Sequence, residues 1–234
     1  FSGAVLDAAR RRPLWLRRLV GELYDAGVLS LLIVCVSGFA VGMVLGLQGY
    51  TQLSRFGAEG NVGAFVGLSL VRELGPVLTS LLVAGRAGSA VAAEIAAMTV
   101  TEQLDGLRMM SVDPLSFVVA PKAFGILLAM PLLSTLFVVF GILGGWMIAV
   151  VSLGGDPGAY LATLEDSVEF SNDVVGGLIK GAVFGVLVGF VATYRGYTAT
   201  PTTAGVSAAA TSTVVIASVA TLTFDYFITA LWGF

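Results

Sequence analysis

The chain has 234 residues, of which 57% are hydrophobic and only 12% are charged, with a formal net charge of −3. Soluble domains carry about 25% charged residues, so this composition excludes an ordinary soluble domain and indicates a bilayer environment. Histidine is absent and Cys35 is the single cysteine, which excludes intrachain disulfides and Ser–His or Cys–His catalysis, and no metal site is expected. Because the sequence starts at Phe1 rather than at a methionine, it does not show whether a targeting signal precedes it.

The N-terminal segment, residues 1–25, is expected to form an amphipathic helix on the membrane surface, over roughly residues 4–25. It is too charged to cross a bilayer, but a basic helix with a tryptophan suits the interface between lipid and water. The residues concerned are Arg10, Arg11, Arg12, Arg17 and Arg18 around Leu14, Trp15, Leu16, Leu19 and Val20. Pro13 is expected to break or to start one of the turns.

Five apolar runs follow, and each has about the 20 residues that a helix needs to cross the hydrocarbon of a bilayer. They cover residues 28–48, 62–84, 123–151, 174–194 and 206–232. The short alternating segments typical of membrane barrels are missing. We therefore expect an all-α integral membrane protein made of one domain over residues 1–234, with an interfacial N-terminal helix and five transmembrane helices.

The positions of the basic residues predict the orientation of these spans, because cytoplasmic loops are enriched in Lys and Arg. The arginine-rich N-terminus is placed in the cytoplasm, and with five spans residues 85–122 and 195–205 fall on the same side. The segment 152–173 has five acidic and no basic residues. It is therefore placed outside, together with the C-terminus.

Four charged residues interrupt the apolar runs: Arg72, Glu73, Lys180 and Asp225. Each costs about 2.5–3.5 kcal/mol at the bilayer centre, so each needs a partner or water. At about 1.5 Å per helical residue, all four fall in the outer half of the membrane. Their similar depth favours one polar cavity, and the alternative is a set of structural ion pairs that hold the helices in register. Pro76 adds a bend beside Glu73 and frees a backbone carbonyl one turn earlier.

The cytoplasmic segment 85–122 combines close-packing signals with a short amphipathic helix. Small residues recur at every fourth position, which allows helices to approach closely: Ala84, Gly88, Ala92 and Ala96. In 101-TEQLDGLRMM-110, Thr101 is expected to cap a helix whose apolar residues are Leu104, Leu107 and Met110. This helix suits either contact with a second protein or an ordinary position on the membrane surface.

The run 72-RELGPVLTSLLVAGRAGSAVAAEIAAMTVTEQLDGLRMMSVDP-114 resembles the signature of the MlaE permease family. The similarity extends in order over essentially the whole chain. It includes 28-VLSLLIVCVSGFAVGMVLGLQGY-50, 177-GLIKGAVFG-185, 196-GYTATPTTAGVSAAAT-211 and 224-FDYFITAL-231.

This resemblance implies the membrane subunit of an ABC transporter that moves phospholipid between the inner membrane of a Gram-negative bacterium and a periplasmic protein, maintaining outer-membrane lipid asymmetry. It implies a homodimer without catalytic activity of its own. The expected partners are a cytoplasmic ATPase that binds ATP and Mg²⁺, a small STAS-domain protein and a periplasmic MCE-domain hexamer. In agreement, the chain has no GxxxxGK[ST] phosphate loop and needs no cofactor of its own.

The resemblance also implies roles for particular residues. The substrate pathway, a lipid cavity between two copies of the permease, would include Arg72, Glu73, Lys180 and Asp225. Contact with the ATPase would involve Glu94, Met98, Thr101, Glu102, Gln103 and Leu104. The same cavity could load lipid from the periplasmic partner or deliver lipid to it, so the direction of transport stays open.

Other functions fit the sequence less well. Charged residues in broken spans also suit an ion-coupled secondary transporter, but such proteins have more spans and internal repeats. A membrane scaffold is an alternative that copurification of lipid would distinguish. An aspartyl intramembrane protease would need a second aspartate at the depth of Asp225, and nothing in the sequence suggests nucleic-acid binding.

Overall fold

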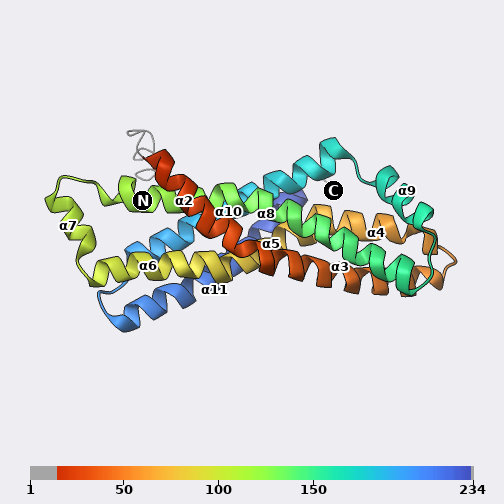
Figure 1. The fold of residues 1–234 in the computed structure, drawn as a ribbon, viewed down its shortest axis with the longest axis horizontal. Coiled ribbons are helices and arrows are strands. Elements are labelled where there is room, and N and C mark those ends of the chain that lie inside the picture. The colour runs from red at the N-terminus through yellow and green to blue at the C-terminus, as the bar shows by residue number, and fades with distance from the viewer. Residues whose placement is uncertain (1–14, 233–234) are drawn as a thin grey trace. The chain divides into compact units, whose positions relative to one another are not determined.

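A computed structural model of the chain describes residues 15–232, and all regular structure in this part is helical (Figure 1). Five helices are long and apolar enough to cross a membrane: Arg18–Ser54, Glu59–Val100, Leu115–Ser152, Phe170–Tyr197 and Thr203–Leu231. The described residues contain no strand. The predictions of an all-α fold and of five helices suited to cross a membrane are therefore confirmed for the described residues.

The helices are longer than the apolar runs that predicted them. The first begins as α2 (Trp15–Gly27), passes through a 3₁₀ turn at Val28–Ser30 and continues as α3 (Leu31–Ser54). Of the predicted interfacial helix, residues 1–14 lie outside the described part of the chain. The second helix extends to Val100, so only residues 101–114 separate it from the third. Which residues lie in the membrane, and on which side each loop falls, stays a prediction.

The chain forms two compact units, each assembled from segments that are distant in sequence. One unit comprises the N-terminal residues up to Ser30, Ser80–Met130 and residues from Ala182 onward. Within it, α6 (Ser89–Val100) lies beside α11 (Thr203–Trp232) (Figure 1). The unit also contains α7 (Gln103–Met109) and parts of α8 (Ala120–Trp146) and α10 (Val175–Tyr197). In α6 the predicted close-packing positions Ala92 and Ala96 are fully buried.

The other unit comprises Leu31–Thr79 and Pro131–Gly181. Here α3 packs closely against α8 through glycines, since a Cβ on Gly42 would lie 1.8 Å from the Gly141 carbonyl oxygen. The same unit holds α4 (Val62–Ser69) against α9 (Pro157–Ser167). Such approaches need small residues because in lipid helices associate by direct packing.

Helix α9 was not predicted from the sequence, although its start has a clear cause. The Asp156 carboxylate caps the helix by accepting hydrogen bonds from Gly158 N and Ala159 N, and Pro157 occupies the first helical position. On α9, Tyr160 is buried and donates its hydroxyl proton to the Ile142 carbonyl at 3.2 Å. Burial raises the pKa of Tyr160 to about 12. The ring therefore stays neutral and anchors α9 to α8.

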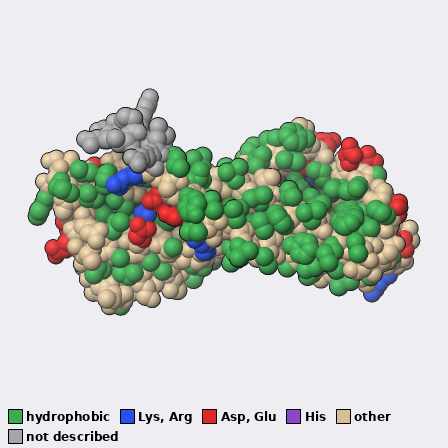
Figure 2. Space-filling view, viewed as in Figure 1, with side chains coloured by type: hydrophobic (Ala, Val, Ile, Leu, Met, Phe, Trp, Pro, Cys, Tyr) green, Lys and Arg blue, Asp and Glu red, His purple; other side chains and the backbone are tan. Residues whose placement is uncertain are grey.

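Large apolar side chains cover much of the molecular surface. On α3, Leu32 is 78% exposed and Val36 is 60% exposed. Figure 2 shows hydrophobic side chains over the part of the surface that α3 and α8 form. Exposed apolar surface on this scale is unfavourable in water and fits helices whose surroundings are lipid chains.

Candidate functional site

The charged pair Arg72–Glu73 lies on a widened turn of the second helix. A π-helical turn, η3 (Leu70–Leu74), separates α4 from α5 (Gly75–Val83), and the Gly75 N–H donates to the Leu70 carbonyl five residues earlier. Such turns occur often at functional sites. In a regular helix the residue at position 76 would donate to the carbonyl of Arg72, but Pro76 has no N–H.

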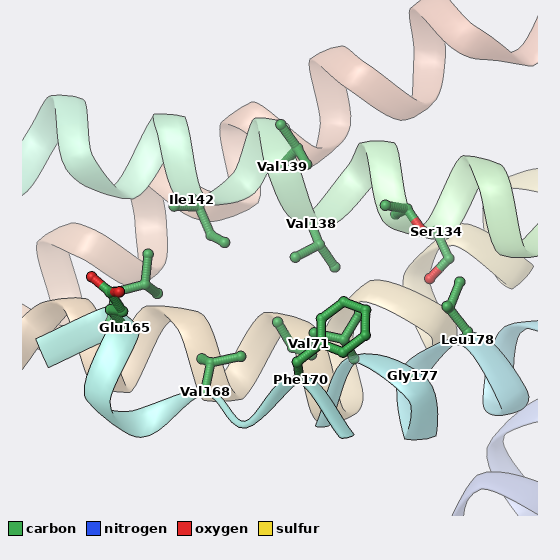
Figure 3. Close-up of a pocket in the computed structure, with 13 residues that line it drawn as sticks. Val71, Ser134, Val138, Val139, Ile142, Glu165, Val168, Phe170, Gly177 and Leu178 are labelled. Carbon is green, nitrogen blue, oxygen red and sulfur yellow. The ribbon is translucent and has the colours of Figure 1, made fainter. Parts of the chain in front are cut away.

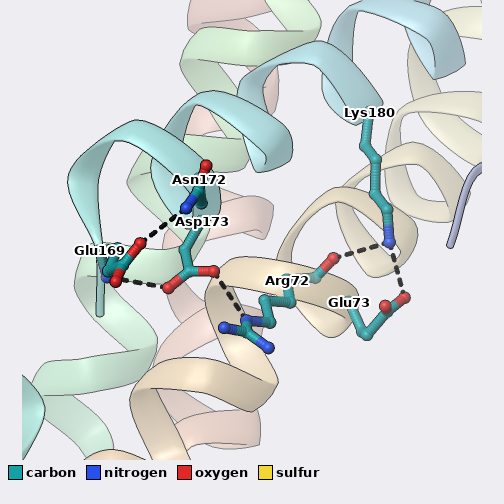
Figure 4. A network of polar contacts seen from close by, with 6 residues as sticks. All are labelled: Arg72, Glu73, Glu169, Asn172, Asp173 and Lys180. Carbon is teal, nitrogen blue, oxygen red and sulfur yellow. Dashed lines mark hydrogen bonds and ion pairs between the residues drawn. The ribbon is translucent and has the colours of Figure 1, made fainter. Parts of the chain in front are cut away.

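Lys180 of α10 donates a hydrogen bond to the Arg72 carbonyl, to which Pro76 cannot donate. Its Nζ donates to the Arg72 carbonyl oxygen at 2.9 Å and lies 2.9 Å from Glu73 Oε2 (Figure 4). The Lys180 side chain is 3% exposed and that of Glu73 is 37% exposed. A charged side chain therefore binds the backbone carbonyl one turn before Pro76.

Arg72 pairs with an acidic residue that the sequence analysis had placed in an outer loop. Arg72 Nε donates to Asp173 Oδ1 at 2.8 Å, while Asp173 Oδ2 accepts from the Glu169 backbone N–H at 2.9 Å (Figure 4). Asp173 lies in η7 (Phe170–Val174), a π-helical turn at the start of the fourth span. Its side chain is fully buried, whereas that of Arg72 is 34% exposed.

The structure thus brings together three of the four predicted pathway residues, and Asp173 completes a balanced set of two cations and two anions. Asp173 is detectable in sequence, since it precedes Lys180 by seven positions and therefore lies on the same helical face. Asp225, the fourth predicted residue, is half-buried on α11 and belongs to the other unit.

A second ion-pair cluster lies in the unit that contains α6 and α11. Lys122, at the start of α8, is almost fully buried, with Nζ 2.9 Å from Glu22 Oε1 of α2 and 2.8 Å from Glu94 Oε2 of α6. Arg86 lies nearby and donates to the Asp25 carbonyl oxygen at 2.6 Å. Glu94, predicted to contact an ATPase, is thus half-exposed and joins three helices through Lys122.

The predicted coupling segment contains the expected short helix, α7 (Gln103–Met109), but the expected cap is wrong. Thr101 Oγ1 donates to the Ala97 carbonyl at 2.9 Å, so Thr101 ends α6 rather than starting α7. The physical reason is that a threonine hydroxyl readily bonds the carbonyl four residues earlier in its own helix. The N-cap position of α7 is Glu102, which has a left-handed backbone with φ of 55°.

The side chains of α7 divide between burial and exposure. Leu104 is buried, whereas Met109 is 89% exposed and the following Met110 is 67% exposed. Arg108 bonds both Asp105 and the Tyr197 hydroxyl. The hydrogen bond to Tyr197, followed by the Asp105 carboxylate, raises the pKa of Arg108. This helix therefore has a fixed base and an exposed apolar tip.

Five apolar helices with ion pairs inside them define a multi-span membrane protein of the transport class, since charged residues in spans mark transport pathways more often than simple anchors. The family model described as Permease MlaE matches residues 19–231. The chain belongs to the MlaE permease family, which confirms the resemblance seen in the sequence.

Curated relatives agree with this assignment over most of their length. The chain is 49% identical over 213 residues to the intermembrane phospholipid transport system permease protein MlaE of Haemophilus influenzae, covering 91% of this chain and 82% of that protein. It is 41% identical to a probable ABC transporter permease protein of Rickettsia felis, covering 99% and 89%. It is 30% identical to the chloroplastic protein TRIGALACTOSYLDIACYLGLYCEROL 1 of Arabidopsis thaliana, covering 99% and 66%.

Proposed function

We propose that this chain is the permease subunit of an ABC transporter that moves phospholipid between the inner membrane and a periplasmic MCE-domain protein, and so maintains outer-membrane lipid asymmetry. Membership of the MlaE permease family supports this function, as do the names of the relatives from Haemophilus and Rickettsia. The protein resides in the inner membrane of a Gram-negative bacterium, with a cytoplasmic N-terminus and a periplasmic C-terminus.

The proposed complex supplies what this chain lacks. The sequence has no phosphate loop, so ATP and Mg²⁺ are bound by a separate cytoplasmic ATPase and the chain itself needs no cofactor. Two copies of the permease form the membrane part. A small STAS-domain protein binds on the cytoplasmic side, and a hexameric MCE-domain ring binds on the periplasmic side.

One observation carries the assignment of the substrate pathway: each ion pair joins a buried partner to a partly exposed one. Asp173 and Lys180 are buried, while Arg72 and Glu73 keep about a third of their side-chain surface exposed. Arg72 is therefore held in place yet accessible to a lipid phosphate, which guanidinium groups bind well. Glu73 balances Lys180 when no lipid is bound, and Asp225 is the fourth pathway residue.

The ATPase contact is proposed for the end of α6 and for α7. Met98, Thr101, Glu102 and Gln103 would lie at this contact, with Leu104 and Glu94 supporting it from inside the unit. Because Glu94 is paired with Lys122, a push on α6 would also reach α2 and α8.

Purification of the chain in mild detergent, expressed with its neighbouring genes, tests the whole assignment. Mass spectrometry of the purified material is expected to find an ABC ATPase, an MCE-domain protein and bound phospholipid. A folded chain that copurifies with neither ATPase nor lipid would contradict the proposal. The buried charges would then be explained by secondary transport or by a structural role.

Substitution of Arg72 tests the pathway directly. Arg72→Lys keeps a positive charge beside Asp173 but loses the fork of donors, so ATP-driven transfer of fluorescent phospholipid should fall about tenfold with little change in stability. Arg55→Lys, at an exposed position of the same unit, is the matched control. Unchanged transfer by folded Arg72→Lys would remove Arg72 from the pathway.

A further inference from the structure

An apolar cavity of about 380 Å³ lies within the unit formed by Leu31–Thr79 and Pro131–Gly181. Its walls come from α8, α9, η7 and α10, with Val71 of η3 also lining it. Figure 3 shows Glu165 and Ser134 toward opposite ends of a row of apolar side chains. The volume falls in the lower part of the range for small-molecule pockets, about 300–1,000 Å³, and is suited to one slender apolar ligand.

The wall that α8 supplies extends over more than two helical turns. Ser134, Val138 and Ile142 line the cavity at four-residue spacing, so they lie along one face of the helix. At about 1.5 Å per residue they cover about 12 Å of the helix axis. An elongated apolar wall of this length fits an extended hydrocarbon chain better than a compact ligand.

The position of the cavity along the chain indicates where its ligand comes from. The α8 residues belong to the third candidate span and Val174 to the fourth, whereas Glu165 lies on α9 between these spans. With the spans in the bilayer as the sequence predicts, one end of the cavity is at the depth of lipid chains, and the end at Glu165 lies where a span meets the headgroup region. A phospholipid has this combination of apolar chain and polar end.

The charge at the Glu165 end selects among phospholipids. Between Ser152 and Asp173 the chain has five acidic and no basic residues; Asp173 is paired with Arg72, whereas Glu165 and Asp166 are both exposed. These carboxylates repel an anionic headgroup and attract an ammonium group. We propose that this cavity binds one acyl chain of a zwitterionic phospholipid whose ammonium group lies beside Glu165. The inference rests on the proposed function only in taking phospholipid as the substrate class.

Photolabelling of the purified full chain in neutral detergent tests this site. Trace phosphatidylethanolamine or phosphatidylglycerol, each with a diazirine in one acyl chain, is crosslinked and mapped by mass spectrometry. We expect labelling in residues 134–142 and 168–178 that excess unlabelled phosphatidylethanolamine abolishes. The ethanolamine probe should label about two- to fivefold more than the glycerol probe, as for one exposed charge contact.

Two kinds of variant separate the chain contact from the headgroup contact. Val138→Trp fills the cavity and should reduce labelling by both probes at least about fivefold; Val139→Trp, at a more exposed lining position, serves if the first variant does not fold. Val36→Trp on α3 is the matched control and should label normally. Glu165→Gln should keep the labelling, but the ethanolamine and glycerol probes should then label to nearly the same extent.

Several results would overturn the proposal. They are labelling that does not saturate, labelling spread evenly over the spans, labelling that both tryptophan variants leave unchanged, and a probe preference that survives Glu165→Gln. Saturable labelling of the cavity in a complex that fails to transfer lipid would count against the proposed function and not against this site. Normal transfer without cavity labelling would overturn the site alone.

Discussion

Lys180 bonds a backbone carbonyl and a carboxylate of the same helical turn. Pro76 cannot donate to the Arg72 carbonyl, and Lys180 Nζ from another helix donates to it instead while also pairing with Glu73. In the bilayer core an unsatisfied carbonyl is costly, so one ammonium group here satisfies a backbone acceptor and a carboxylate together. One side chain of α10 therefore bonds two groups of η3.

Replacing Lys180 by an apolar residue should therefore lower the stability of the unit, although the hydropathy of the span increases. Lys180→Met makes the span more apolar, yet it removes a buried donor from two acceptors and should lower the free energy of unfolding by about 1–3 kcal/mol. Thermal unfolding in detergent measures this change. Lys180→Arg, which keeps the charge and the donors, should lose less. A methionine variant as stable as the parent would show that water satisfies both acceptors.

At the scale of single residues, the sequence shows which charges are costly to place in a span, but it shows less well which residues they pair with. Arg72, Glu73 and Lys180 stand out because each interrupts an apolar run. Asp173 does not, because it lies at the end of a run, where a charge is ordinary. Thr101 was misassigned because a hydroxyl can bond the helix that precedes it as easily as the one that follows.

The helices themselves are well predicted because a bilayer requires all backbone groups of a span to be bonded within the helix. Five apolar runs therefore gave five helices. The predicted spans are shorter than the observed helices. A helix can continue beyond the hydrocarbon where another helix covers it, as α11 covers α6. The start of α9 could have been predicted from Asp156–Pro157, a capping residue followed by proline.

Close contact between α3 and α8 gives the clearest test of packing. In Gly42→Ala the new Cβ would lie 1.8 Å from the Gly141 carbonyl oxygen, which is backbone and cannot give way. The two helices must separate, and we expect a loss of about 3 kcal/mol or more, or no folded protein. Gly21→Ala on α2, whose new Cβ would meet no described residue outside its own helix turn within 4 Å, should instead stabilise by about 0.5–1 kcal/mol. Equal unfolding temperatures for the two variants would contradict the observed packing.

The cluster around Lys122 predicts how α2 is held. Lys122→Met leaves Glu22 and Glu94 without their shared cation and should destabilise the unit by about 3–5 kcal/mol, because Lys122 and Glu22 form a largely buried pair. Hydrogen exchange should rise in residues 18–30 first. Asp105→Asn removes an exposed ion pair from the same unit and should change the stability little. Unchanged exchange in α2 would show that apolar packing alone holds it.

Within the proposed complex, substitutions at the exposed end of α7 should have the largest effect on coupling to the ATPase. Met109→Glu with Met110→Glu places charges at two largely exposed positions, so folding should be preserved. We expect less copurifying ATPase and ATP hydrolysis uncoupled from lipid transfer, while bound phospholipid stays the same. Leu104→Glu is the contrasting variant, since Leu104 is buried and its loss should reduce folded yield. Normal coupling in the double methionine variant would place the ATPase contact elsewhere.

The division of the chain into two units has a consequence for genetic manipulation. The boundaries fall after Ser30, Thr79, Met130 and Gly181, and each of these positions lies inside one of the first four long helices rather than in a loop. Neither unit is a continuous stretch of coding sequence, so no single truncation can yield either one. Fragment libraries, circular permutation and protease nicking should therefore recover functional protein only from breaks between the long helices, at residues 55–58, 101–114, 153–169 and 198–202.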